Sequence, residues 1–166
     1  MNSETDWPAR VAVSAATWRD WRSIMALEKL CFGRDAWSAL DVAAALTFPD
    51  TVRLKAEFED KLIGVVVGDI RSRNNVGWIA TIAVHPAYRR RGLGRRLLRA
   101  CEQAIDLPRI KLTLRPSNQA AFNLYKQEGY EAIRSLRDYY ADGTEALVME
   151  KRLAQATNPA HDSYSE

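Results

Sequence analysis

The sequence is poor in cysteine and histidine, which excludes two classes of site. Among its 166 residues there are two cysteines, Cys31 and Cys101, and two histidines, His85 and His161. Two cysteines are too few for a disulfide framework, and no cluster of ligands has the spacing of a zinc site. Cys101 falls on the apolar face of an expected helix, so we predict a buried free thiol there and no bound metal.

Long apolar runs and the common nucleotide-binding glycine patterns are also missing. No apolar stretch approaches the roughly 18 residues of a membrane-spanning helix, and no segment resembles a signal peptide. We therefore expect a cytoplasmic protein with no membrane partner. Neither GxxxxGK[ST] nor GxGxxG occurs, so neither nucleotide-binding family fits.

Size and charge describe an ordinary globular chain. Its length is most simply one domain, residues 1–153, followed by a C-terminal tail, 154–166, where Asn, Pro, Asp and Ser gather. The formal net charge of +3 suits an anionic ligand as well as it suits nucleic acid, so charge does not choose between them.

Hydrophobic periodicity predicts a mixed α/β fold with a sheet of about seven strands and about four helices. Strands are expected at residues 11–13, 52–59, 62–70, 78–84, 109–114, 131–140 and 145–151. Helices are expected after Thr17, after Ser38, through 97–105 and from Asn118 to Gln127, where Gly129 ends the last one. On the helix through 97–105, Leu97, Leu98, Cys101, Ala104 and Ile105 form the apolar face, and Glu102 lies on the polar one.

One stretch, "HPAYRRRGLGRRLL" at residues 85–98, places two glycines among arginines between a strand and a helix. The start of a helix has about four N–H groups without partners and a partial positive charge. Gly92 and Gly94 would let a phosphate approach these donors. A basic patch for RNA and a merely solvated helix face remain alternatives, but acids dilute the patch, so no specific nucleic-acid partner is expected.

This stretch resembles a known motif. Arg89-x-x-Gly92-x-Gly94, directly after "IAVHPAY", is similar to the acyl-coenzyme-A-binding motif of the GNAT superfamily of N-acetyltransferases. "LRPSNQAAFNLYKQEGYEAI" resembles the next segment of that superfamily. "YYADGTEALVMEKRL" and "CFGRDAWS" resemble the C-terminal hairpin and the segment after the first helix of protein N-terminal acetyltransferases, especially the RimI-type ribosomal-protein alanine acetyltransferases. The resemblance covers most of residues 11–153.

The resemblance implies a GNAT fold, splayed at the cofactor-binding strand, with acetyl-CoA as cosubstrate. Val84 would use its main-chain N–H to polarise the thioester carbonyl, and Tyr125 would give a proton to the coenzyme A thiolate. A buried core tyrosine is the alternative for Tyr125. The implied cofactor-binding residues are Ile82, Ala83, Val84, Arg90, Arg91, Gly92, Leu93, Gly94, Arg95 and Asn118.

The acceptor side is less well defined. The resemblance implies that Tyr139, Tyr140 and Trp37 wall the acceptor pocket, although plain packing would explain them equally well. Where RimI-type enzymes carry a glutamate base, this chain has Thr113, which cannot act as one. Water, His85 or Glu57 would have to take the proton. An α-amine, with a pKa of about 7.7–8.0 against about 10.4 for lysine, needs a strong base less.

Three functions follow. The chain transfers acetyl groups to the α-amine of a protein or peptide N-terminus; it acetylates a small amine such as a polyamine, antibiotic or amino-acid derivative; or it is an RNA-binding module without catalysis. The first is favoured because the predicted site lacks a strong base. A monomer or a homodimer is expected.

Overall fold

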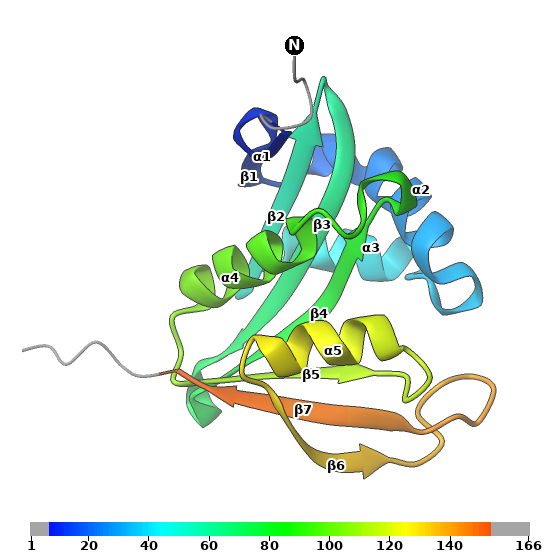
Figure 1. Ribbon diagram of the computed structural model, residues 1–166, viewed down its shortest axis with the longest axis vertical. Coiled ribbons are helices and arrows are strands. Elements are labelled where there is room, and N and C mark those ends of the chain that lie inside the picture. Colours follow the sequence, from blue (N-terminus) through cyan, green and yellow to red (C-terminus); the bar gives the residue numbers. More distant parts are fainter. Residues whose placement is uncertain (1–6, 154–166) are drawn as a thin grey trace, which may run out of the picture.

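The computed structural model describes residues 7–153, built on one seven-stranded sheet in the order β1-β2-β3-β4-β5-β7-β6 (Figure 1). The predicted tail, 154–166, lies outside the described residues. The strands are β1 (Ala12–Ala15), β2 (Thr51–Phe58), β3 (Lys61–Arg71), β4 (Val76–Val84), β5 (Arg109–Leu114), β6 (Glu131–Leu136) and β7 (Ala146–Arg152). The helices are α1 (Trp7–Arg10), α2 (Trp21–Phe32), α3 (Ala39–Thr47), α4 (Leu93–Ile105) and α5 (Gln119–Gln127). Four 3₁₀ turns join them, η1 (Trp18–Asp20), η2 (Gly33–Asp35), η3 (Ser72–Asn74) and η4 (Pro86–Tyr88).

The sheet is mixed, as the sequence predicts. Neighbouring strands pair antiparallel except β4 and β5, which pair parallel because α4 carries the chain back across the sheet. Within residues 7–153 the β4–β5 pairing covers only the pairs from Val76↔Arg109 to Ile79↔Leu112. The upper part of β4, residues 80–84, therefore diverges from β5, which confirms the predicted splay.

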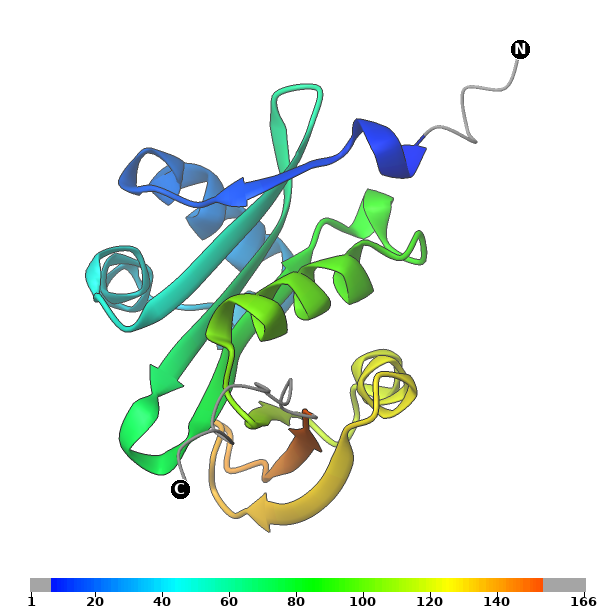
Figure 2. The same cartoon turned by 90° about the vertical axis from the view of Figure 1, so that its left-hand side faces the viewer.

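Helices cover both faces of the sheet (Figure 2). On one face, Val65, Val67 and Ala83 pack against Ile24 of α2 and Val42 of α3; we call this the α2 face. The opposite, α4 face carries the larger core cluster, which includes Val66, Ile79 and Leu112 of the sheet, Leu97 and Leu98 of α4, and Tyr125 of α5. The central strands β3 and β4 contribute residues to both cores, as a side-chain period of two allows.

Local capping explains where two helices start. Ser38 Oγ accepts from the Asp41 N–H, and the Asp41 carboxylate accepts from the Ser38 N–H at 2.8 Å, a reciprocal cap that stabilises α3 by about 1 kcal/mol. Thr17 begins the turn η1 rather than α2 itself, and its N–H donates to Asp20 Oδ2 at 2.7 Å. Gly129, at φ +88°, ends α5 as predicted.

Three sequence expectations need correction. The strand expected at 131–140 ends at Leu136, and residues 137–145 form a longer connection that carries both predicted tyrosines. Glu102, expected on the polar face of α4, is 5% exposed because Tyr130 and Lys151 both donate to its carboxylate at 2.7 Å. Ala104, expected on the apolar face, is exposed. None of the helices in residues 7–153 has the length and apolar character that a membrane crossing requires.

Candidate active site

The main chain of Val84 points into the gap between β4 and β5. The His85 N–H donates to the Ile63 carbonyl at 2.9 Å, so the next pair, Gly64↔Val84, is of the type that exchanges no hydrogen bonds. The N–H and C=O of Val84 therefore face away from β3. The Val84 carbonyl accepts hydrogen bonds from Arg89 Nε at 2.9 Å and from Cys31 Sγ at 3.4 Å. The Val84 N–H is the group that the resemblance implies as donor to the thioester carbonyl.

A loop with left-handed backbone follows β4 and leads into α4. Arg90 has φ +62° and Gly92 has φ +80°, and Gly92 is the N-cap of the 13-residue helix. Such turns direct successive N–H groups toward one point, which makes them anion sites. A Cβ built on Gly92 would have no heavy atom within 4 Å, so this glycine opens directly to solvent.

Gly94 lies where β4, α4 and α5 meet. A Cβ at this position would be 3.8 Å from Val84 Cγ2 and 3.5 Å from Leu124 Cδ2, which places the start of α4 beside both elements. Tyr125 follows Leu124, and its side chain is buried in the α4-face core, with its ring 5.8 Å from that of Tyr130. Burial and the nearby Tyr140 raise the pKa of Tyr125 above its ordinary value. Its hydroxyl therefore stays protonated at neutral pH, as a proton donor must.

The remaining predicted cofactor residues take different positions around this junction. Ile82 packs on the α4 face, whereas Ala83 faces α2, so Ala83 can offer the cofactor its main chain alone. Leu93 is buried in the core. The Asn118 side chain caps α5 by accepting from the Ala121 N–H at 3.1 Å. Arg91 is exposed beside the loop, with its guanidinium 5.2 Å from the Trp7 ring.

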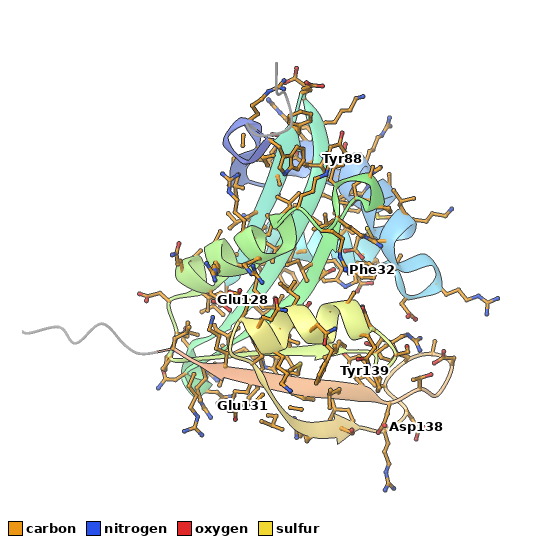
Figure 3. The ribbon with its side chains drawn as sticks, in the orientation of Figure 1. Phe32, Tyr88, Glu128, Glu131, Asp138 and Tyr139 are labelled. Atoms are coloured by element: carbon orange, nitrogen blue, oxygen red, sulfur yellow. The ribbon has the colours of Figure 1, made fainter. Side chains whose placement is uncertain are left out.

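Ion pairs between α4 and α5 fix the outer side of this junction. Arg95 Nε and Arg99 Nε each lie 2.6 Å from a Glu128 carboxylate oxygen, and Arg95 also donates to Gln127 at 2.7 Å. Glu128, at the end of α5, lies between the two helices (Figure 3). The Arg99 guanidinium holds the pKa of Glu128 below its usual value. Because the Arg95 side chain is committed to α5, a cofactor would meet its main chain.

On the α2 face, a buried carboxylate fixes Trp37. Glu28 is 1% exposed; it accepts from Thr81 Oγ1 at 2.7 Å and from the Trp37 N–H at 3.4 Å. Burial raises the pKa of Glu28, against the lowering effect of the Thr81 hydrogen bond. The sequence does carry a signal for this burial, because Glu28 has helical spacing from the apolar Ile24 and Leu27.

A second cluster joins the two segments that carry the predicted aromatic wall. Arg115, directly after β5, donates to both carboxylate oxygens of Asp35 in η2 and to Asp142 in the β6–β7 connection. Its guanidinium also lies 4.0 Å from the centre of the Tyr140 ring. Tyr140 in turn packs edge-on against Tyr139, which is half exposed (Figure 3). Sequence reasoning missed this cluster because its members lie far apart along the chain.

Thr113 and the two candidate bases, His85 and Glu57, have different surroundings. Thr113 faces the acceptor wall, with Oγ1 3.4 Å from the Tyr139 hydroxyl. His85 Nδ1 accepts from the Ala87 N–H at 3.2 Å, so this ring nitrogen already has a hydrogen-bond partner in the turn after β4. Glu57 is paired with Lys55 at 3.0 Å, on a strand two positions away from β4. Among residues 7–153, no group of three or more His, Cys, Asp or Glu side chains is placed to hold a metal ion.

Comparison with known proteins agrees with this geometry. Residues 18–130 match the acetyltransferase (GNAT) family. The chain is 32% identical over 149 residues to the N-alpha-acetyltransferase RimI of Mycobacterium tuberculosis, covering 85% of this chain and 92% of that protein. It is 28% identical over 155 residues to the N-terminal acetyltransferase A complex catalytic subunit NAA10 of Arabidopsis thaliana, covering 89% and 81%.

A solved structure shares the fold. The ribosomal-protein-S18-alanine N-acetyltransferase from Escherichia coli superposes with a TM-score of 0.79 at 23% identity, covering 90% of this chain and 97% of that one. The family match spans most of the described residues, and the M. tuberculosis relative is aligned over most of both chains. The chain therefore belongs to the GNAT family of acetyltransferases, which take their acetyl group from acetyl-CoA.

Proposed function

We propose that this enzyme transfers the acetyl group of acetyl-CoA to the α-amine of a protein or peptide N-terminus. The observation that carries the proposal is the contact between Thr113 and Tyr139: at the position where a carboxylate base is expected, the chain has a hydroxyl against an aromatic wall. An acceptor that loses its proton readily suits such a site. The two relatives above, which carry Nα-acetyltransferase names, support the same choice.

The donor site fits acetyl-CoA on three observations. The Val84 N–H faces the gap beside β5, Gly92 opens the start of α4 to solvent, and a Cβ at Gly94 would narrow the junction with α5. When bound, acetyl-CoA supplies the acyl group as an activated thioester. The main-chain N–H groups of residues 90–95 would hold its pyrophosphate, and Asn118 would contact it farther along.

Two groups of the chain then serve the transfer. Val84 would donate its N–H to the acyl oxygen as negative charge develops there, in a site partly shielded from water. Tyr125 would protonate the departing sulfur, and the proton that the attacking amine releases to water would restore its hydroxyl. The amine loses its proton to water, since roughly a tenth of an α-amine is already neutral near pH 7.

Trp37, Tyr139 and Tyr140 would shape the acceptor pocket. They come from the two segments that Arg115 joins, so the width of the pocket depends on that cluster. A thiol-release assay tests the function directly. Acetyl-CoA is supplied with unmodified N-terminal peptides, with the same peptides blocked at the α-amine, and with polyamines and amino-acid derivatives. Turnover on the unblocked peptides alone is expected; turnover confined to the small amines would overturn the proposal.

A further inference from the structure

A basic hollow lies on the α2 face, at the end of the sheet away from Val84. It is lined by Arg71, Asn74, Val76, Trp78, Arg109 and Lys111, which come from the β3–β4 turn and from paired parts of β4 and β5. Three of the six are cations and none is an acid. Figure 2 shows α2 and α3 beside the upper part of the sheet, with the β3–β4 turn below them. The candidate site described above makes no use of this hollow.

Contacts with neighbouring residues fix the cations of this hollow. The Arg71 guanidinium lies 5.2 Å from the centre of the Trp78 ring, and Arg109 Nη2 donates to the Asn74 carbonyl at 3.0 Å. Lys111 lies 3.2 Å from Glu150. Asp69, which is directly opposite Trp78 in the register, is the other nearby acid. Glu150 offsets the charge of Lys111. Burial raises the pKa of Asp69 and the nearby Arg71 guanidinium lowers it, so Asp69 offsets the charge of Arg71 in part. Three cations therefore face two acids, and the hollow keeps a net positive charge.

Strand β5 connects the hollow to the acceptor wall. Arg109, Lys111 and Thr113 alternate with Ile110 and Leu112, whose side chains lie in the α4-face core, so these three point to the α2 face together. Thr113 contacts Tyr139 at the acceptor pocket. The hollow and the pocket therefore lie on one face and on one strand.

We propose that the hollow binds an acidic segment of the acceptor polypeptide, downstream of the amine that is acetylated. The proposal rests on the proposed function. Lys111 and Arg109 lie about 7 and 13 Å from Thr113 along β5, which an extended peptide covers in about two to four residues. With the first residue in the pocket, acidic side chains at about positions 3 to 6 would reach the cations.

The chemistry of the hollow favours a carboxylate-bearing peptide over nucleic acid. Guanidinium groups match carboxylates in a two-point geometry, and Trp78 offers an apolar wall to the peptide backbone and side-chain stems. A nucleic acid would require an extended track of cations for its phosphates. Here Asp69 and Glu150 interrupt such a track.

The test compares two peptides that differ in charge alone. Both have a free N-terminus and identical first two residues, and they carry either Glu or Gln at about positions 3 to 6. The ratio of their kcat/KM values in the thiol-release assay is measured at low and high salt. A preference of about fivefold for the Glu peptide at low salt, falling toward parity at high salt, is expected for partly exposed ion pairs.

Variants locate the effect. The double variant Arg71→Gln/Arg109→Gln should bring the ratio to about one, since both guanidinium groups are lost. Arg109→Gln alone, which removes one guanidinium and its hydrogen bond to the Asn74 carbonyl but keeps Arg71, should lower the ratio in part. Lys61→Gln, an exposed cation at the opposite end of β3, should keep it. Thermal unfolding and acetyl-CoA binding of each variant report whether it folds.

The outcomes separate the two proposals. If neither peptide is acetylated, the proposed function fails and this inference fails with it. If both are acetylated with equal kcat/KM, the function stands and the acidic-segment site does not. If the double variant lowers the affinity for a single-stranded RNA and leaves the peptide ratio unchanged, the hollow serves nucleic acid and the inference is wrong.

Discussion

Arg115 and Asp35 stand 80 residues apart and form a two-point ion pair, with Nη2 at 2.8 Å from Oδ1 while Nε donates to Oδ2. The same guanidinium reaches Asp142 at 3.0 Å. The Arg115 guanidinium holds the pKa of Asp35 below its ordinary value, so the pair persists at neutral pH. One side chain at the end of β5 thus ties η2 to the β6–β7 connection, the two segments that flank the proposed acceptor pocket.

Replacing Arg115 should affect the acceptor and not the donor. In Arg115→Ala both segments lose their common partner, so the KM for the peptide should rise about tenfold while acetyl-CoA affinity, measured by calorimetry, stays within about twofold. Arg115→Lys should recover little, because an ammonium cannot make the two-point contact. Arg137→Ala, an exposed arginine of the same connection, is the control. Equal losses of donor and acceptor affinity would show that Arg115 has a general structural role.

A carboxylate placed in the loop before α4 should abolish acetyl-CoA binding. Gly92→Asp introduces a negative charge at the helix start, where the pyrophosphate is proposed to lie. The matched control is Gly129→Asp, because Gly129 has a similar φ of +88° and its Cβ would approach no atom closer than Lys151 Cε at 4.0 Å. Both variants bear the left-handed strain of about 1 kcal/mol. Calorimetric titration with acetyl-CoA should detect binding to the control alone. If Gly92→Asp still binds acetyl-CoA, the pyrophosphate does not lie at this loop.

Removing the hydroxyl from each of two buried tyrosines should have different effects: one substitution should lower kcat and the other the unfolding free energy. Tyr125→Phe is expected to lower kcat about 100-fold or more and to leave the KM for acetyl-CoA and the melting temperature nearly unchanged. Tyr130→Phe should do the reverse. Its hydroxyl donates to the buried Glu102 at 2.7 Å, and losing that bond costs about 1–3 kcal/mol of unfolding free energy. A Tyr125→Phe enzyme with full turnover would disprove the assignment of the proton donor.

Acid should weaken the α4–α5 junction through Glu128. The Arg99 hydrogen bond lowers the folded-state pKa of Glu128 below the ordinary 4.5, so its contribution is complete above that value and is lost as the pH falls through the lowered pKa. Glu128→Gln should therefore reduce the unfolding free energy at pH 7, and its difference from the wild type should shrink as the pH falls. Denaturant titrations at several pH values measure this difference.

The control for that experiment is Glu131→Gln, three residues away and exposed on β6 (Figure 3). Its unfolding free energy should follow the wild-type pH profile. A Glu128→Gln difference that is constant from neutral to acid pH would mean that the ion pairs with Arg95 and Arg99 do not depend on the ionised carboxylate.

The parts of the fold that the sequence predicts are those with local causes. Alternating strands, the helix that begins after Ser38, and the glycine at 129 that ends α5 each depend on neighbours within a few residues, and all seven predicted strands are present. The last hairpin shows the limit. The hairpin is present, but β6 stops at Leu136 instead of continuing to residue 140. The connection is instead held by Arg115, which no local pattern reveals.

The candidate site likewise contains residues that a local motif predicts and residues whose partners are distant in sequence. The structure places Val84, Gly94 and Leu124 of α5 around one junction, and the roles that the motif implies there remain predictions. Helical spacing could indicate that Glu28 is buried, but not that it pairs with Thr81, which is 53 residues distant. The contact of Cys31 was missed for the same reason, since it is made to the main chain of Val84, 53 residues along the chain.

Because β4 pairs with β5 only from Val76↔Arg109 to Ile79↔Leu112, the sheet consists of two leaves, β1–β4 and β5–β7, which are joined at one end and separate at the other. We call the joined end the hinge. Gly77 lies in that hinge, where a Cβ would come within 2.5 Å of Ile105 and 2.8 Å of Ile110, so α4 locks the two leaves together at this point. A small rotation between the two leaves at Gly77 would displace Val84 farther than Trp78, because Val84 lies farther along β4 from that point. The reactive end of the enzyme is thereby set by packing at the end where no chemistry takes place.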